Sequence, residues 1–329
     1  MKRILVCGLP RSGSTWISKV LSVNSSVKYL HEPDNERQNL LSFIYKRNLP
    51  RFPHLIASDN SPKYKTLFQK AYEGYYMQPY GKISNIIRDI FGLTVDELEQ
   101  RIKENNEIEA QEQTAAGIRE YLINITIQIA SYSKKILSFQ GTNHDAILLK
   151  SVHCPLALEF LMSHIAIDKV LVIFRHPASI IASHLRMENN DIWRPFLSKS
   201  RLLRETLADF ESDIRTLGTP LEKAGARIGA VYYILENQQE RLGFNVTMYE
   251  SLCRDKISGF KQLYQQLDLQ WNKQVEDYIR ELDTSGEGYS VKRIAERQIN
   301  KWQEELSKEQ IKAIKRGYQI FSSDLKYEF

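Results

Sequence analysis

The chain has 329 residues, little cysteine and no long apolar run, and each of these shortages narrows what it can be. Its cysteines have no metal-ligand spacing, which argues against a cysteine metal centre and favours buried free thiols in a reducing compartment. They are Cys7, Cys154 and Cys253. No apolar stretch approaches the roughly 18 residues of a membrane span, and the run that starts at Ile4 ends by Pro10, too short for a signal peptide. We therefore expect a protein of the cytoplasm with no membrane span.

The chain also lacks clusters of charge of one sign. Lysine and arginine number 45 against 40 aspartates and glutamates, which gives a net charge of +5 at pH 7, and the basic residues are scattered. A nucleic-acid partner favours grouped basic residues with aromatic ones between them, so we expect a small polyanionic ligand and no nucleic acid. Hydrophobic residues at 42% are enough for a sizeable core. With no internal repeat and no low-complexity linker, residues 1–329 are expected to form one domain.

Short apolar runs alternate with helical patterns along the chain. The runs typical of buried parallel strands are Ile4–Cys7, Val27–Leu30, Ala146–Leu149, Val170–Phe174 and Val246–Met248. The helical patterns are Ser14–Ser22, Pro155–Ile165, Pro177–Arg186, Leu202–Leu217 and Leu221–Leu242. This alternation predicts an α/β fold, with a parallel sheet flanked by helices.

Two segments depart from the alternation. Residues 33–136 lie between the second and third strands; they begin with a stretch rich in proline, asparagine, tyrosine and glycine, and from a capping pattern at Thr94 they are helical. We expect this helical insertion either to cover an acceptor substrate or, equally, to serve as a structural lid or oligomer contact. Residues 290–329 are again helical and follow a loop marked by Gly286 and Gly288.

The most informative absence is a lysine in the first loop. The residues after the first strand match the P-loop pattern G-x-x-x-x-G-K-[ST] at Gly8 and Gly13, but Ser14 stands where the pattern has lysine. Thr15 follows, and the only cation of the loop is Arg11. Backbone N–H groups and a helix N-terminus still favour an anion there. The loop therefore predicts an anionic nucleotide other than ATP or GTP.

Polar residues follow every predicted strand. In an open parallel sheet, ligands bind beyond the carboxyl ends of the strands. The residues at those ends are the loop 8–15, His31-Glu32, Lys150-Ser151, Arg175-His176 and Tyr249-Glu250. Their shared position predicts an anion site with a carboxylate beside it.

A second missing residue bears on the chemistry. A P-loop kinase ends an apolar strand in an aspartate that holds Mg²⁺, whereas the fourth strand here ends in Arg175. An arginine offers a two-pronged set of N–H donors to phosphate or sulfate and works without a metal. A metal-free site fits the transfer of a sulfuryl group, which carries less negative charge than a phosphoryl group.

Four segments resemble sulfotransferases that use 3′-phosphoadenylyl sulfate (PAPS), and they occur in the order found in that family. Segment 8–16, Gly-Leu-Pro-Arg-Ser-Gly-Ser-Thr-Trp, is similar to the family's P-loop-like loop for the 5′-phosphosulfate, and 170–186 is similar to its 3′-phosphate motif. Segment 249–252 resembles the family's Tyr-Glu-Asp-Leu strand end, with Ser251 in place of aspartate, and 300–306 resembles its C-terminal helix with a tryptophan. The first two matches together are specific.

The resemblance implies roles residue by residue. Arg11, Ser14 and Thr15, with the loop N–H groups, would hold the 5′-phosphosulfate, and Arg175 with Ser183 would hold the 3′-phosphate. The whole set implied for the nucleotide is Pro10, Arg11, Ser12, Gly13, Ser14, Thr15, Trp16, Arg175, Ser183 and Tyr249. PAPS would be the co-substrate and 3′,5′-ADP the product, with no metal and no prosthetic group.

Two residues compete to be the base that takes the proton of the acceptor. Glu32 resembles the glutamate base of tyrosylprotein and some carbohydrate sulfotransferases, and a right-handed strand–helix–strand unit would place it beside the loop. His153 is the competitor, because 150–155 resembles the Lys-Thr-His-Leu-Pro of cytosolic sulfotransferases with one residue inserted. The insertion shifts the imidazole by a register step, so we favour Glu32. Lys150 is a candidate for contacting the sulfuryl oxygens in either case.

The sequence thus predicts an enzyme that moves a sulfuryl group from PAPS to a hydroxyl, or less favourably an amine, by in-line displacement. The acceptor would be a small molecule, a carbohydrate or a peptide. Two other interpretations stay open: a divergent P-loop kinase, and a non-catalytic nucleotide-binding protein of the same fold. The identity of the acceptor and the oligomeric state stay open as well.

Overall fold

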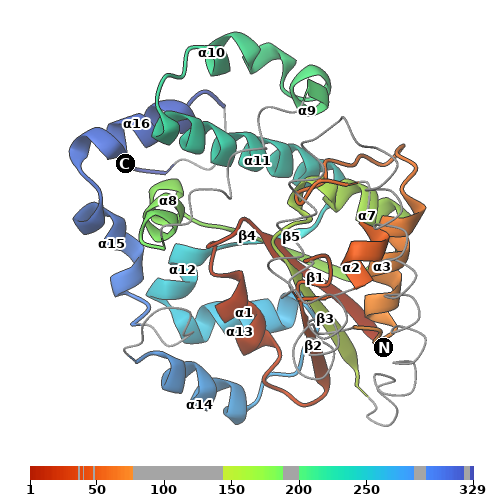
Figure 1. Cartoon of the computed structure of the whole chain (residues 1–329). Coiled ribbons are helices and arrows are strands. Elements are labelled where there is room, and N and C mark those ends of the chain that lie inside the picture. Colours follow the sequence, from red (N-terminus) through yellow and green to blue (C-terminus); the bar gives the residue numbers. More distant parts are fainter. Residues whose placement is uncertain are drawn as a thin grey trace, which may run out of the picture. The chain divides into compact units, whose positions relative to one another are not determined.

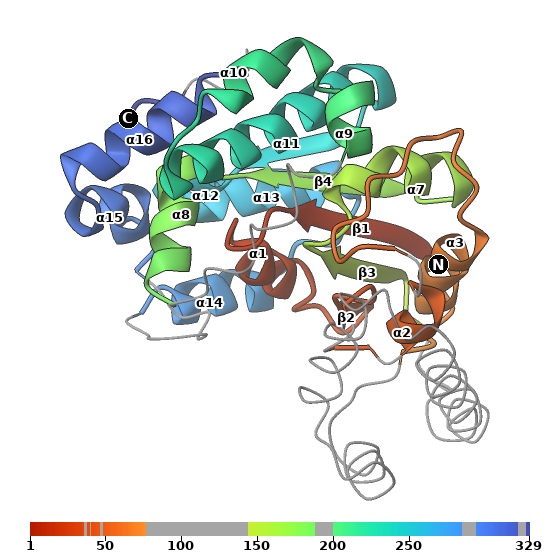
Figure 2. The same ribbon diagram turned by 45° about the horizontal axis from the view of Figure 1, so that its top comes forward.

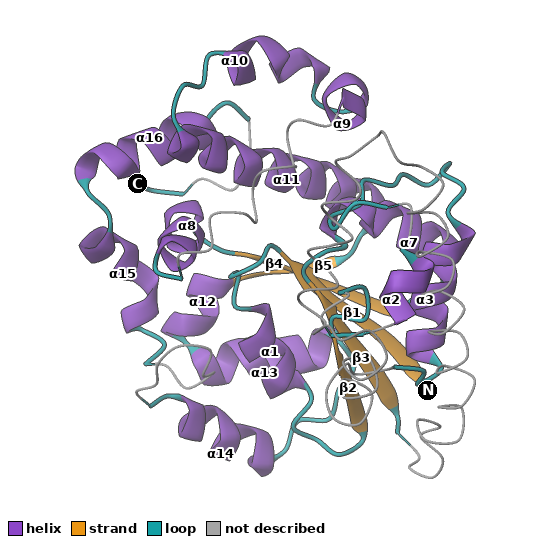
Figure 3. Ribbon diagram, viewed as in Figure 1, coloured by secondary structure: helices purple, strands orange, loops and turns teal. Residues whose placement is uncertain are grey.

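Five strands form one sheet in the order β2-β3-β1-β4-β5 (Figure 1). The strands are β1 (Lys2–Gly8), β2 (Val27–His31), β3 (Ala146–Ser151), β4 (Lys169–Phe174) and β5 (Asn245–Met248). The pairs β1–β3, β1–β4 and β4–β5 are parallel. Every expected strand is present, each slightly longer than its apolar run, and the predicted α/β fold with a parallel sheet is confirmed (Figure 3).

The computed structural model describes most of the chain, and all structural statements below concern that part. The described residues are 1–35, 38–39, 41–46, 49–76, 144–187, 200–284, 294–321 and 327–329. They divide into two compact units, one of residues 1–29, 52–59 and 144–329, and one of residues 30–51 and 60–143. Among the described residues, no helix is long and apolar enough to cross a membrane.

The sheet is covered on both faces, which explains why its strands read as continuous apolar runs. Ile4 and Val6 of β1 pack in one core with α1 (Ser14–Leu21), α13 (Lys256–Gln266) and α14 (Lys273–Leu282). Leu5 and Cys7 alternate with them and are just as buried. They face the other side of the sheet, where Figures 1 and 2 show α7 (Leu158–His164) and α11 (Pro220–Leu242).

Most of the expected helices are present, but one is wrong. The segment Leu202–Leu217 is divided among α9 (Ser200–Glu205), a 3₁₀ turn (Ala208–Phe210) and α10 (Glu211–Arg215). Leu207 is fully buried and leaves the helical conformation, with φ −122° and ψ 19°. The 3₁₀ turn and α10 have no buried residue. A helix draws most of its stability from packing an apolar face, so this exposed sequence does not extend α9.

The remaining elements are found where the sequence departs from strand–helix alternation. Between β2 and β3 the structure has α2 (Leu41–Tyr45) and α3 (Pro62–Tyr72), and α3 falls in a stretch that was expected to be irregular. The predicted helical sequence from Thr94 to residue 136, and Gly286 and Gly288, lie outside the described residues. The predicted C-terminal helices are α15 (Arg297–Glu305) and α16 (Lys308–Tyr318).

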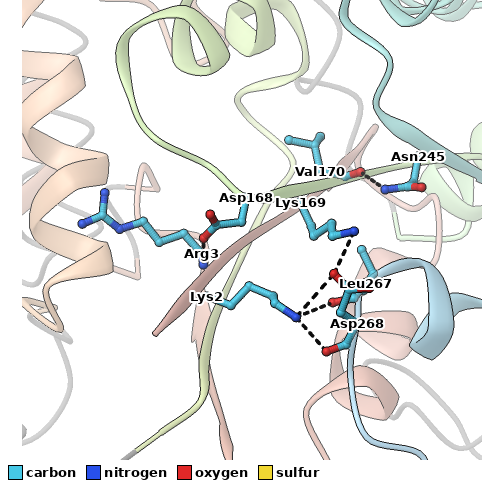
Figure 4. A network of polar contacts seen from close by, with 8 residues as sticks. All are labelled: Lys2, Arg3, Asp168, Lys169, Val170, Asn245, Leu267 and Asp268. Carbon is cyan, nitrogen blue, oxygen red and sulfur yellow. Dashed lines mark hydrogen bonds and ion pairs between the residues drawn. The ribbon is translucent and has the colours of Figure 1, made fainter.

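Charged side chains join the amino ends of the strands, away from the edge where ligands were predicted. Figure 4 shows Lys2 of β1 and Lys169 of β4 converging on Asp268, in the turn after α13. The carboxylate lies 2.9 Å from Lys169 Nζ and 3.6 Å from Lys2 Nζ. The hydrogen bond from Lys169 and the charges of both lysines lower the pKa of Asp268. This network ties two neighbouring strands to the helical layer beneath them.

Helices α11 and α16 approach so closely that glycine is required where they meet. A Cβ on Gly317 of α16 would lie 1.9 Å from the Glu222 carbonyl oxygen of α11. A Cβ on Gly225 of α11 would lie 2.2 Å from the Ile314 carbonyl oxygen of α16. Because backbone atoms cannot move aside as a flexible side chain can, the two helices sit at a separation that only glycine permits.

We expect Gly317→Ala to lower the free energy of unfolding by about 1–3 kcal/mol, the usual cost of overpacking. The direction is informative, because alanine in a helix interior otherwise stabilises by roughly 0.5–1 kcal/mol relative to glycine. Gly218→Ala is the matched control, since the nearest atom to its Cβ would lie 3.9 Å away. Urea denaturation of both variants measures the difference, and equal midpoints would contradict the packing argument.

Candidate nucleotide-binding site

The loop after β1 is shaped by two glycines, each needed for a different close approach. A Cβ on Gly8 would lie 2.8 Å from the Ile173 carbonyl oxygen of β4. Gly13 has φ +89°, and a Cβ there would lie 2.4 Å from the ring of Tyr249. Between them the chain turns sharply: Ser12 N donates to Leu9 O at 3.0 Å. The loop therefore sits directly against β4 and the residue that follows β5.

Helix α1 begins at this loop and presents donors to it. Gly13 is its N-cap and has no side chain to cap the first turn, which contains no acidic residue. Ser14 is buried, whereas Thr15 and Trp16 are half-buried. The ring of Trp16 meets the ring of Tyr249 edge-on, with centroids 5.7 Å apart. Uncapped N–H groups at a helix N-terminus favour an anion.

Arg175, directly after β4, reaches back to the same loop. Its Nη1 donates to the Arg11 carbonyl oxygen at 2.8 Å. Its guanidinium carbon lies 4.3 Å from the centroid of the Tyr249 ring, a cation–π contact. Its Nε is buried and has no hydrogen-bond partner among the described residues. The resemblance assigned Arg175 and the loop to two phosphate groups of one nucleotide, and the structure places them in contact.

Arg11 joins a third element to the cluster. Its Nε donates to Ser183 Oγ at 2.9 Å, and Ser183 is buried on α8 (Pro177–Leu185). His184, the next residue, has its pKa lowered to about 4, mainly by burial and further by the charge of Arg11. It is therefore neutral at neutral pH, and the positive charge beside the loop comes from the two arginines.

His176 supports this edge in a way that the sequence did not signal. Its Nδ1 accepts from Ala178 N at 3.2 Å and so caps α8, while its Nε2 donates to the Glu328 carbonyl oxygen at 2.8 Å. The ring stacks on Trp302 of α15, with centroids 4.4 Å apart. Burial lowers the pKa of His176 to about 4, so the neutral ring that both contacts need is present at neutral pH. Many sulfotransferases have aspartate or asparagine here, residues that cap helices in the same way.

The backbone of His176 is held by an acidic residue. His176 N donates to Glu250 Oε1 at 2.8 Å, where α12 (Tyr249–Arg254) begins after β5. Burial raises the pKa of Glu250. The Tyr-Glu pair of segment 249–252 thus has two separate contacts, Tyr249 with the loop and Arg175, and Glu250 with the start of α8.

Lys150 and His153 lie at the carboxyl end of β3, the neighbour of β1. Lys150 is paired in register with Val6, and Ser151 with Cys7. Both Lys150 and His153 are buried. His153 N donates to Ser151 Oγ at 3.0 Å, and its ring meets that of Phe52 edge-on at 5.1 Å.

Glu32 belongs to the second compact unit. It has φ +48°, which is uncommon for a residue other than glycine, and it is buried. Its carboxylate accepts a hydrogen bond from Asn35 Nδ2 and lies 3.8 Å from His31 Nε2. Its place beside the loop and its role as a base stay predictions.

These observations define the class of the protein: a P-loop-type α/β fold with a basic site at the carboxyl edge of its sheet. A family model described as the sulfotransferase family matches residues 3–273, and the chain belongs to this family. The match includes the loop, Lys150, Arg175, Ser183 and Tyr249. No curated protein matches the chain.

Three solved structures are similar to it. The sulfotransferase domain from the curacin biosynthetic pathway is 14% identical, with 98% of each chain covered and a TM-score of 0.44. The sulfotransferase domain from the Synechococcus PCC 7002 olefin synthase is 12% identical, with 96% of this chain and 94% of that one covered and a TM-score of 0.45. A sulfotransferase from Alicyclobacillus acidocaldarius is 13% identical, with 99% and 97% covered and a TM-score of 0.36.

We expect Gly13→Ala to destabilise the protein more than Gly243→Ala does. Both glycines have a positive φ, so both variants pay a backbone strain of roughly 1–2 kcal/mol. Only at Gly13 would the new Cβ also strike a neighbour, since nothing lies within 4 Å of it at Gly243. The clash with Tyr249 should add about 1–3 kcal/mol to the loss. Thermal unfolding of both variants without ligand measures the difference, and equal losses would refute the contact between the loop and Tyr249.

Proposed function

We propose that this protein transfers a sulfuryl group from PAPS to the hydroxyl group of an acceptor. The observation that carries the proposal is the convergence of two arginines on one glycine loop. Arg11 is bonded to Ser183, and Arg175 is bonded to the carbonyl oxygen of Arg11. PAPS carries two phosphate-type anions at opposite sides of one ribose, and a pair of neighbouring guanidinium groups suits such a ligand. Membership of the sulfotransferase family supports the same transfer.

Each group of the site has a part in the proposed binding. The N–H groups at the start of α1, with Ser14, Thr15 and Arg11, would hold the 5′-phosphosulfate. Arg175 and Ser183 would hold the 3′-phosphate. Because both arginines keep their charge at all relevant pH values and His184 is neutral, the affinity for the nucleotide should not depend on histidine titration near neutral pH.

The reaction itself would be an in-line displacement. The acceptor oxygen forms a bond to sulfur while the bond from sulfur to the bridging oxygen breaks, and that oxygen leaves with the electron pair as part of 3′,5′-ADP. The cations and N–H donors around the loop would stabilise the charge that develops on the leaving oxygen. Lys150 would contact the sulfuryl oxygens. Glu32 would take the hydroxyl proton, with His153 as the alternative base.

The choice of nucleotide can be tested without knowing the acceptor. We expect 3′,5′-ADP to raise the melting temperature in the absence of Mg²⁺, and ATP to do so much less, because the loop has no lysine for a γ-phosphate. At about 100 times its Kd, a ligand of the native state adds about 2.7 kcal/mol to the free energy of unfolding. A thermal-shift titration with both nucleotides, with and without Mg²⁺, makes the measurement. Strong stabilisation by ATP that depends on Mg²⁺ would favour a divergent kinase.

The base can be identified by two substitutions. We expect Glu32→Gln to keep PAPS binding and to lower turnover by roughly 10²–10⁴, the usual effect of losing a general base. His153→Ala should cost far less, because its imidazole is shifted by the residue inserted after Lys150. The measurement is turnover of each variant on one acceptor, together with its Kd for PAPS. An inactive His153→Ala beside an active Glu32→Gln would reverse the assignment.

A further inference from the structure

The backbone of Arg175 is held by a single hydroxyl group. Arg175 N donates to the Tyr232 hydroxyl at 3.0 Å, and the same hydroxyl donates to the Arg175 carbonyl oxygen at 2.7 Å. Tyr232 comes from α11, a helix far from Arg175 in the sequence. One oxygen atom therefore satisfies both polar backbone groups of the residue whose side chain reaches the loop.

Tyr232 is itself firmly seated. Its side chain is completely buried, and its ring meets Phe174 edge-on, with centroids 4.8 Å apart. One turn earlier, Gly229 lets α16 come close: a Cβ there would lie 2.8 Å from the Tyr318 carbonyl oxygen. Burial raises the pKa of Tyr232 far above its ordinary value, so the hydroxyl keeps the proton that it donates. The packing of α11 thus fixes where the oxygen lies.

The side chain of Arg175 depends on that backbone. Its guanidinium has one hydrogen bond, to Arg11 O, and one ring contact, with Tyr249. These contacts set its far end, whereas the direction in which the side chain leaves the main chain follows from φ and ψ at Arg175. Without the Tyr232 hydroxyl, two buried backbone groups would lack partners, and the peptide groups would rotate to find others.

We propose that Tyr232 is a positioning residue, whose hydroxyl orients Arg175 toward the phosphate group that distinguishes 3′,5′-ADP from 5′-AMP. The inference rests on the proposed function, because it takes Arg175 to be the contact of the 3′-phosphate. It assigns to Tyr232 no contact with the nucleotide.

The test compares the affinities for 3′,5′-ADP and 5′-AMP by calorimetry, in the full-length protein and its variants. The readout is the ratio of the two Kd values, which does not depend on the fraction of folded protein. We expect Tyr232→Phe to lower this ratio about tenfold, as for the loss of a buried hydrogen bond, by weakening 3′,5′-ADP and sparing 5′-AMP. In an Arg175→Ala background, Tyr232→Phe should change the ratio no further.

Tyr264→Phe is the matched control. Tyr264 is also buried, and its hydroxyl donates to the Val20 carbonyl oxygen at 2.6 Å, without a contact to Arg175. It should lose similar stability and keep the ratio of the unaltered protein. Should Tyr232→Phe fail to fold, Tyr232→His replaces it, since its ring is too short to bond both backbone groups, and the same loss is expected.

The outcomes separate this inference from the function beneath it. An unaltered protein that does not prefer 3′,5′-ADP over 5′-AMP would overturn the proposed function and the inference together. A clear preference that Tyr232→Phe retains, or a loss that is equal for both nucleotides, would overturn the inference alone. So would a further fall of the ratio in the Arg175→Ala background.

Discussion

The hydrogen bond from Arg175 Nη1 to the Arg11 carbonyl oxygen is the contact on which the site depends. It closes the loop after β1 onto the end of β4, and it can form only because the loop passes so near. Gly8 permits the approach to β4, and Gly13 permits the approach to Tyr249. Placing two guanidinium groups this close is unfavourable without an anion between or beside them. The geometry is therefore that of a site prepared for a strongly anionic ligand.

Support for this contact comes from elements outside the loop. Helix α16 packs on α11 through glycines, α11 carries Tyr232, and Tyr232 holds the backbone of Arg175. On the other side of the same residue, His176 is held by Glu250, and its ring packs on Trp302 and bonds to Glu328. The end of β4 is thus fixed from the middle and the C-terminal part of the chain at once. Rigid support of this kind lowers the cost of ordering a side chain when a ligand binds.

Charge is divided between the two ends of the sheet. At the amino ends, Lys2 and Lys169 are compensated by Asp268. At the carboxyl edge, Arg11 and Arg175 meet carbonyl, hydroxyl and ring partners, while the neighbouring histidines are neutral because they are buried. The basic character of the chain is modest as a whole, so its local concentration at one edge matters more for ligand binding than the net charge.

Local patterns in the sequence determined the strands, the loop and the family, because buried parallel strands are continuous apolar runs and only glycine fits the tight approaches of the loop. The same patterns were wrong for Leu202–Leu217 and missed α3, since helix length there depends on which face finds a partner. Tyr232 and the contacts of His176 gave no signal at all: a tyrosine within a helix looks like any core residue until the strand that it touches is known. Only the tertiary structure decided these, because a hydrogen bond between residues far apart in the chain depends on how whole helices pack, and that is not written in any one segment.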